Sequence, residues 1–588
     1  MGNRLLVRHF LQRFLDHDLI SPDADRREVL TITCALIVVS SLFLAFFLAV
    51  KFQFNIFLPP GLTALVALDD RFLLISVSMI VMALVAVAEW DALSLDARDT
   101  AVLGPLPVPA AAIVRAKFIA LFLFAAAFDA GVNLGPTLMR AVAVPVRLPV
   151  TMVGGLKLTV AHAASALTAG AFGFVAVLGL REACRALLGP ARFQRISAGV
   201  QGVLVVCLTT ALLLLPGAYS RVAMTWMTHD RVPPAAVPPL WYVGLHETIA
   251  GGIIDGLPRG TPPRRYLAAE RTATALYRSL WPSFHRLAFI AVVGSIALLA
   301  IVAAACVWNN RRLPADVVAH HRGLRGLQRA WLWAVSRAVV RRPVEQAGFF
   351  FTLQSLARSA PHRVTIAASA ALAFTIVVIT LSGNDLQRRL DPASMPLSLL
   401  ALQMLLIGVV LTGFRHAVRV PAEAGANWIF HLAWTGDETP YLTGVKRAAL
   451  VALVAPTVLM LLVLDVFTLG AGLAVAHAAF GLGEAMLLLE ILFLKYRKLP
   501  FASSYVRSED LKSVGPLYVV GLSTTAVTFA AFERAALASV PGVVAGLGAL
   551  ATLVMAVRAY DASYRRMRFP IDLDEIPSGA TQRLELTR

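Results

Sequence analysis

Long apolar stretches recur along almost the whole chain, and they restrict what it can fold into. An α-helix needs roughly twenty mostly apolar residues to cross the hydrocarbon core of a bilayer. In that medium every backbone N–H and C=O must be paired within the structure, which favours helices. The chain is 58% hydrophobic and only 15% charged, so a soluble globular protein is excluded. We predict an all-α, polytopic helical membrane protein.

About twelve apolar segments are long enough to be membrane spans. They are residues 29–50, 72–87, 118–136, 159–180, 196–216, 287–307, 364–381, 395–414, 448–466, 469–494, 514–531 and 541–557. The predicted organisation is an interfacial helix in 1–28, a first six-helix half in 29–308 with an extracytoplasmic loop at 217–285, a cytoplasmic linker with an interfacial helix in 309–363, a second six-helix half in 364–557 and a cytoplasmic tail in 558–588.

The basic residues lie mainly in alternate connections between the spans, which predicts the orientation of the chain. With the N-terminus in the cytoplasm, the Arg- and Lys-rich segments fall on one side of the membrane, as the positive-inside rule requires. These segments are 181–195, 311–363, 415–447, 495–512 and 558–568. We therefore predict a multi-pass protein of a bacterial inner membrane with both termini in the cytoplasm. This placement also explains the net charge of +18 without a nucleic-acid partner.

The order of segments indicates an internal duplication. An amphipathic segment at 5–19 precedes the first span, and a similar segment at 343–358 precedes the seventh. In each half a helical pair is followed by a longer cytoplasmic loop, at 89–117 and 415–447, and then by four more spans. Parallel repeats of six helices are one way to build a membrane pathway between halves.

The loop at 89–117 is unusually acidic for a cytoplasmic loop, since such loops normally collect Lys and Arg. Its prolines also give it a shape. A short helix can end at Gly104, and a new helix can begin at Pro109, whose missing N–H is harmless in a first turn. We predict a bent element that protrudes beneath the membrane and leads through Lys117 into the third span.

The sequence LGPLPVPAAAIVRAK within this loop resembles the connection between the second and third helices of ABC-2 type transporter permeases. RVPAEAGANWIF (419–430) and KLPFASSY (498–505) are similar to segments of a twelve-span bacterial branch of such permeases. The resemblance implies a non-enzymatic transport subunit, an exporter, in contact with membrane lipids and with a separate cytoplasmic ABC ATPase. One chain could supply the complete permease, or two chains could form a homodimer.

The resemblance also implies that the partner binds ATP and that this chain needs no cofactor. The sequence agrees, because it contains no GxxxxGK[ST] phosphate loop. The two bent loops then become candidate docking surfaces for the ATPase. Their candidate residues are Asp91, Asp96, Asp99, Leu106, Pro107, Lys117, Pro421, Glu423 and Trp428.

Ionisable side chains inside predicted spans are a second set of candidates, because each is unfavourable in hydrocarbon. They are Asp129, His162, Asp465, His477, Glu484 and Glu490. Glu484 and Glu490 point roughly 120° apart on a helix, which argues against a carboxylate pair. We expect Glu490 to reach Lys495 or the interface. Asp129 either lines a polar pathway or caps an irregular helix.

The extracytoplasmic loop at 217–285 is rich in proline and aromatic residues and is predicted to form a compact cap. Its adjacent His246 and Glu247 should point apart on a helix, and no HExxH spacing is present, so no metal site is predicted. Two alternatives to a permease stay open. An ion-coupled secondary transporter would use Asp129 as its coupling carboxylate, and a membrane-embedded lipid- or glycan-processing enzyme would use the outer loop.

Overall fold

The computed structural model describes most of the chain as helices. The described residues are 2–15, 38–39, 41–43, 45–46, 50, 60–90, 110–147, 152–228, 233–251, 267–311, 333–382, 396–420, 439–496, 498–501 and 510–567. They contain no β-strand, and they divide into two compact units, Met1–Ala319 and His320–Arg588. The prediction of an all-helical membrane protein is confirmed.

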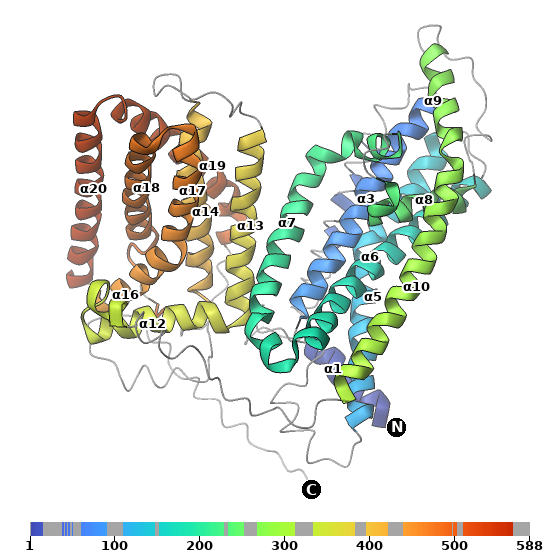
Figure 1. Ribbon diagram of the computed structural model, residues 1–588, viewed down its shortest axis with the longest axis horizontal. Helices are drawn as coiled ribbons and strands as arrows, with labels where there is room; N and C mark the ends of the chain where they lie inside the picture. The colour runs from blue at the N-terminus through green and yellow to red at the C-terminus, as the bar shows by residue number, and fades with distance from the viewer. Residues whose placement is uncertain are drawn as a thin grey trace. The chain divides into compact units, whose positions relative to one another are not determined.

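Unit 1 is built around α3 and α6 (Figure 1). Its helices are α1 (Gly2–Leu15), α3 (Pro60–Ala88), α5 (Ala110–Arg147), α6 (Met152–Leu188), α7 (Pro190–Thr228), the short η1 (Pro234–Ala236), α8 (Pro238–Ala250), α9 (Leu267–Ser279) and α10 (Trp281–Arg311). α3 packs against α6, α7, α8 and α9, while α6 also contacts α5, α8 and α10. The core therefore includes α8 and α9, which come from the segment predicted to form a cap.

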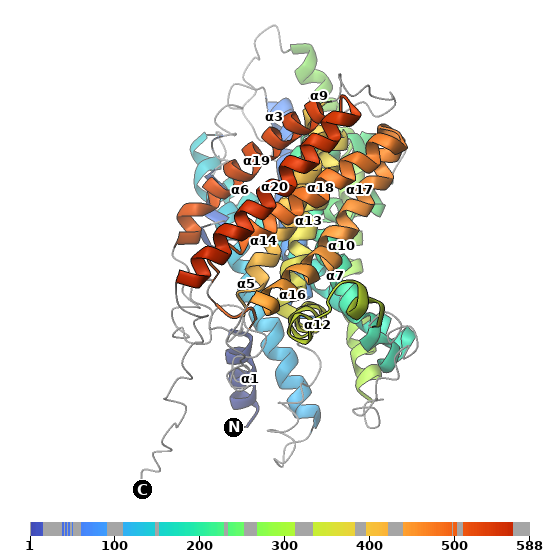
Figure 2. The same cartoon turned by 90° about the vertical axis from the view of Figure 1, so that its left-hand side faces the viewer.

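Unit 2 contains α12 (Pro343–Arg358), α13 (Ala360–Ser382), α14 (Leu397–Ala417), α16 (Thr439–Ala449), the π-helical turn η6 (Leu450–Val454), α17 (Ala455–Thr468), α18 (Ala471–Leu492), α19 (Asp510–Ala536) and α20 (Val540–Met567). Figures 1 and 2 show α17, α18, α19 and α20 side by side, with α12 and α16 at one end of the unit. The π-helical turn precedes Pro456, which has no N–H to continue an α-helical ladder.

Ten described helical segments are long and apolar enough to cross a membrane, five in each unit. They overlap ten of the twelve predicted spans. The predicted span at 29–50 lies largely outside the described residues, and that at 514–531 lies inside α19, which is not among the ten. The count of twelve therefore stays a prediction.

One detail of the predicted helices is corrected. For the third span, which holds Gly131 and Pro136, one of the two alternatives was that Asp129 caps an irregular helix. Instead, α5 continues without interruption from Ala110 to Arg147, so Asp129 lies in mid-helix and caps nothing. A proline is tolerated there because neighbouring groups in a packed bundle can satisfy the backbone that it leaves unpaired.

Candidate functional site: two anchored loops and three buried polar clusters

The loop at 89–117 starts from a fixed point at the end of α3. Trp90 is 1% exposed; its indole N–H donates to Ser197 Oγ at 2.7 Å, and its ring stacks on Phe193. The Gln201 amide donates to the Val87 carbonyl at 3.0 Å. These contacts tie the end of α3 to the beginning of α7. The candidate docking residues Asp91, Asp96, Asp99, Leu106 and Pro107 lie outside the described residues.

The far end of the same loop leads into α5, which packs against α1. The Lys117 ammonium lies 5.5 Å from the centre of the Phe10 ring. Both side chains are buried, so this cation–π contact joins α1 to α5 where α5 enters its span. The prediction of a helix in this segment is confirmed by α1 for the described residues Gly2–Leu15, and its position at the membrane interface stays a prediction.

The second loop has a similar base at the end of α14. The Arg415 guanidinium donates to the Leu492 carbonyl at 2.8 Å and lies 4.1 Å from the centre of the Tyr496 ring. The Phe501 N–H donates to the Val418 carbonyl at 2.9 Å. α14 is thereby joined to the end of α18 and to the segment that follows it. Pro421, Glu423 and Trp428 lie outside the described residues.

The second loop leads into α16, which packs against α12. Arg447 donates to Glu345 Oε2 at 2.8 Å and to the Val339 carbonyl at 2.7 Å. Gly348 and Gly444 allow the two helices to approach closely, because a Cβ at either position would collide with the backbone of the other helix. The predicted helix at 343–358 is confirmed by α12, which packs on α16 and is ion-paired to it, and its position at the membrane interface stays a prediction.

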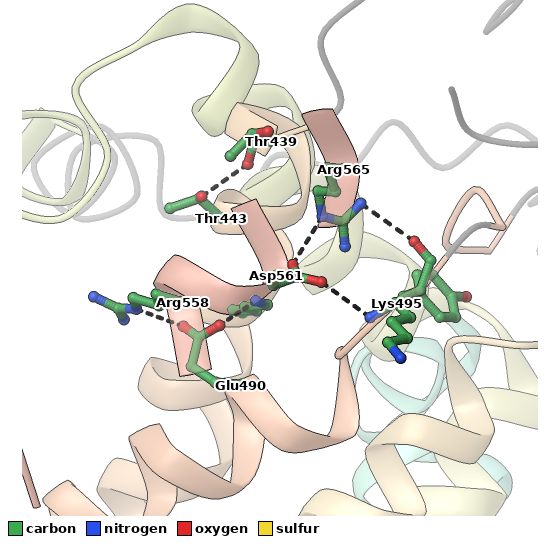
Figure 3. A network of polar contacts seen from close by, with 9 residues as sticks. Thr439, Thr443, Glu490, Lys495, Arg558, Asp561 and Arg565 are labelled. Carbon is green, nitrogen blue, oxygen red and sulfur yellow. Dashed lines mark hydrogen bonds and ion pairs between the residues drawn. The ribbon is translucent and has the colours of Figure 1, made fainter. Parts of the chain in front are cut away.

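An ionic network joins α16, α18 and α20 next to this crossing (Figure 3). Glu490 accepts from Lys446 at 2.5 Å and from Arg558 at 2.7 Å. Of the two alternatives expected for Glu490, contact with Lys495 is therefore wrong, and a position at the membrane interface stays a prediction. The backbone N–H of Lys495 donates to Asp561 Oδ1 at 3.0 Å, and the second carboxylate oxygen of Asp561 accepts from Arg565 at 2.8 Å. The sequence pattern of a single helix could not predict which residues of neighbouring helices Glu490 contacts.

Asp129 belongs to a buried polar cluster between α3, α5 and α6. Its Oδ1 accepts from Asn133 Nδ2 at 2.8 Å and from Ser78 Oγ at 3.2 Å, while Gly170 of α6 lies directly against the carboxylate. Asp129 and Asn133 are each 4% exposed. The cluster therefore joins three helices, and a role in a polar pathway stays a prediction.

A second buried cluster in unit 1 joins α3 to α8 and α9. Arg71 forms an ion pair with Glu247, and Tyr277 O–H donates to Glu247 Oε2 at 2.5 Å. His246 Nδ1 also lies 3.2 Å from Glu247 Oε1, so the expectation that these neighbours point apart is wrong. Both residues lie in α8, whose limits are set by the sequence. The helix begins with two prolines and is followed by Gly251, whose φ of 67° favours glycine.

Electrostatics keep Glu247 ionised although it is buried. Burial by itself raises the pKa of this carboxyl, but the Arg71 guanidinium, with the contacts from His246 and Tyr277, lowers it to about 2. Burial and the adjacent Glu247 carboxylate together raise the pKa of Tyr277, so its hydroxyl remains a hydrogen-bond donor. Within the described part of the chain, no group of three His, Cys, Asp or Glu side chains is arranged to hold a metal ion.

The third cluster lies in unit 2 and brings together residues from four helices. His477 of α18 lies 2.6 Å from Glu533 of α19 and 3.8 Å from Asp465 of α17, measured between ring nitrogens and carboxylate oxygens. Gln403 of α14 donates to the His477 carbonyl at 2.8 Å. Glu484 is also buried here and interacts electrostatically with Glu533. The absence of a Glu484–Glu490 pair was predicted correctly, because Glu490 belongs to the ionic network described above.

Glu533 was missed in the sequence because it follows the predicted span that ends at residue 531. α19 continues to Ala536, which carries this glutamate into the helix bundle, where it is 1% exposed. The charge of Glu533 next to an apolar run was the signal, but span boundaries are too uncertain in a sequence to place a residue so near the end.

No protein-family model matches the chain, and neither the curated proteins nor the solved structures include one that is similar to it. Function is therefore inferred from the residues and their contacts.

Proposed function

We propose that the chain is the membrane-spanning permease subunit of an ATP-driven, ABC-2 type exporter, powered by a separate cytoplasmic ATPase. The observation that supports the proposal is that both long loops are attached to well-packed helices at each end. Each starts at a helix end that is held by side-chain contacts, at Trp90 and Arg415, and leads into a helix that packs against a short preceding helix. A partner that moves such a loop would move membrane helices with it.

The pattern of packing within each unit supports an internal repeat. In unit 1, α3 packs against α6 and α7, α5 against α6, and α6 against α10. In unit 2, α14 packs against α18 and α19, α17 against α18, and α18 against α20. The short helices correspond as well, since α1 packs on α5 and α12 on α16. Two six-helix halves with one docking loop each account for this correspondence.

The energy source is assigned to a partner because the sequence lacks a phosphate loop. In this proposal the ATPase binds ATP beneath the membrane and contacts Asp91, Asp96 and Asp99 of the first loop and Glu423 and Trp428 of the second. The chain lies in a bacterial inner membrane with both termini in the cytoplasm. One chain supplies both halves of the permease, and a homodimer would double the number of docking loops.

Charge reversal tests the docking surface. Asp91→Lys combined with Asp99→Lys should weaken assembly with the ATPase, measured by co-purification from membranes, because the acidic loop would then repel a basic partner surface. Asp255→Lys in the predicted extracytoplasmic loop makes one such charge reversal and should leave assembly intact. Unchanged assembly of the double variant would show that this loop is not the docking surface.

A further inference from the structure

The buried cluster of unit 2 contains more acidic than basic groups. Asp465, Glu484 and Glu533 are three carboxyl groups, and His477 is the one imidazole among them. His477, Glu484 and Glu533 are each 2% exposed or less. Charged groups are stable in such surroundings only when they are paired or neutralised. His477 can compensate one carboxylate at most.

The other helices packed around the cluster bring no further compensating charge to it. α17 has no ionisable residue besides Asp465, and the ionisable residues of α14, Arg415 and His416, lie at its opposite end. The first ionisable residue of α20 is Arg558, which binds Glu490 in the ionic network. On α19, Arg534 follows Glu533 but is exposed. The described helices therefore leave the carboxylates in excess.

Two buried polar atoms indicate that something is still to be bound. Among the described residues, neither Glu484 Oε2 nor Gln403 Oε1 has a hydrogen-bond partner. Gln403 lines a pocket together with Asp465, Thr468 and His477, and the rest of the lining is leucine. The cluster therefore contains oxygen atoms without hydrogen-bond partners. Beside it lies a small pocket whose lining includes the Asp465 carboxyl group and the His477 imidazole.

We propose that Asp465, His477, Glu484 and Glu533 form a proton-binding site inside unit 2, filled through the pocket beside Gln403. A proton on a carboxylate removes a buried negative charge and supplies an O–H donor at the same time. A proton on Glu484 or Glu533 removes the electrostatic repulsion between these two carboxylates. The site therefore holds more than the single proton that His477 would carry as an imidazolium.

The position of the site gives its protons a route. Asp465 lies in the last turn of α17, His477 near the start of α18 and Glu533 in the last turn of α19. This is the end of the unit opposite α12 and α16 (Figure 1), and in the proposed topology it faces the outside. Glu484 lies about two turns further along α18. Protons from outside can thus reach a carboxyl group well inside the bundle.

Infrared spectroscopy of the full-length chain in lipid bilayers at pH 7 tests the proposal. Protonated carboxyl groups absorb separately from carboxylates, so the wild-type chain should show their band, and Glu484→Gln and Glu533→Gln should each reduce it. Glu490→Gln makes the same substitution on α18 at an ion-paired site and should leave the band unchanged. Equal bands in all four chains would overturn the proposal.

Two measurements on the wild-type chain do not depend on whether the variants fold. The band should shift in D2O, because protons reached through the pocket can exchange. It should also keep its intensity when choline chloride is replaced by sodium chloride at constant pH. A band that resists exchange would contradict access through the pocket, and a sodium-dependent loss would identify a metal cation, not a proton, as the ligand. Neither measurement involves the ATPase, so the proposed function can fail independently.

Discussion

Arg71 and Glu247 form a buried ion pair whose partners come from helices far apart in the sequence. Removing one member of such a pair leaves the other charge buried and uncompensated, which typically destabilises a protein by about 3–5 kcal/mol. The pair joins α3 to α8, so its loss should weaken the packing of α8 on α3.

We predict that Glu247→Gln lowers the stability of the full-length chain at pH 7 by about 3 kcal/mol. The folded-state pKa of Glu247 is about 2, below the usual carboxyl value near 4.3. Its contribution is therefore present above about pH 4.3 and is lost as the pH falls towards 2. Thermal unfolding between pH 3 and 7 should show a smaller pH dependence for the variant. Tyr277→Phe keeps the carboxylate and should retain the pH dependence, and an identical dependence in Glu247→Gln would contradict this account.

The ionic network around Glu490 should respond unequally to its two cations. The Lys446 side chain is 16% exposed, whereas that of Arg558 is 57% exposed. Solvent screens an exposed pair, so Arg558→Gln should change stability by less than about 1 kcal/mol. Lys446→Gln should be more destabilising, because Lys446 is the less exposed of the two cations that pair with the buried Glu490. Chemical denaturation in detergent compares the two, and a larger effect of Arg558→Gln would refute this ranking.

At the scale of helices, the crossing of α12 and α16 depends on two glycines. We predict that Gly348→Ala and Gly444→Ala each destabilise the chain by about 1–3 kcal/mol, because the added methyl group would collide with backbone atoms that cannot move alone. Gly521→Ala in α19 is the matched control, since a Cβ there meets no atom within 4 Å. Melting temperatures of the three variants test the prediction, and equal effects at all three positions would contradict it.

The helices themselves were largely predictable from the sequence, whereas the contacts between them were not. Apolar length located ten spans, and the amphipathic pattern located α1 and α12. The partners of Glu490 and the meeting of His477 with Glu533 depend on how helices pack side by side. Small changes of helix rotation decide such contacts, and hydrophobic periodicity does not determine rotation closely enough.

In the whole molecule, the two loops of the proposed permease act as a pair. Charge reversal in the first loop alone should leave the second loop available. We therefore predict that Asp91→Lys with Asp99→Lys lowers the amount of bound ATPase more strongly when Glu423→Lys is added. Quantitative co-purification of the double and triple variants measures the difference. Full ATPase binding by the triple variant would exclude both loops as docking surfaces.

Co-purification from native membranes distinguishes an ATP-driven permease from an ion-coupled transporter. The wild-type chain should bring down a cytoplasmic ABC-type ATPase, and the rate of ATP hydrolysis by that subunit should depend on the presence of the chain in the same bilayer. The opposite result would be a chain that purifies without any ATPase and transports its substrate in proteoliposomes when only an ion gradient is applied. That result would contradict an ATP-driven permease and would favour an ion-coupled transporter.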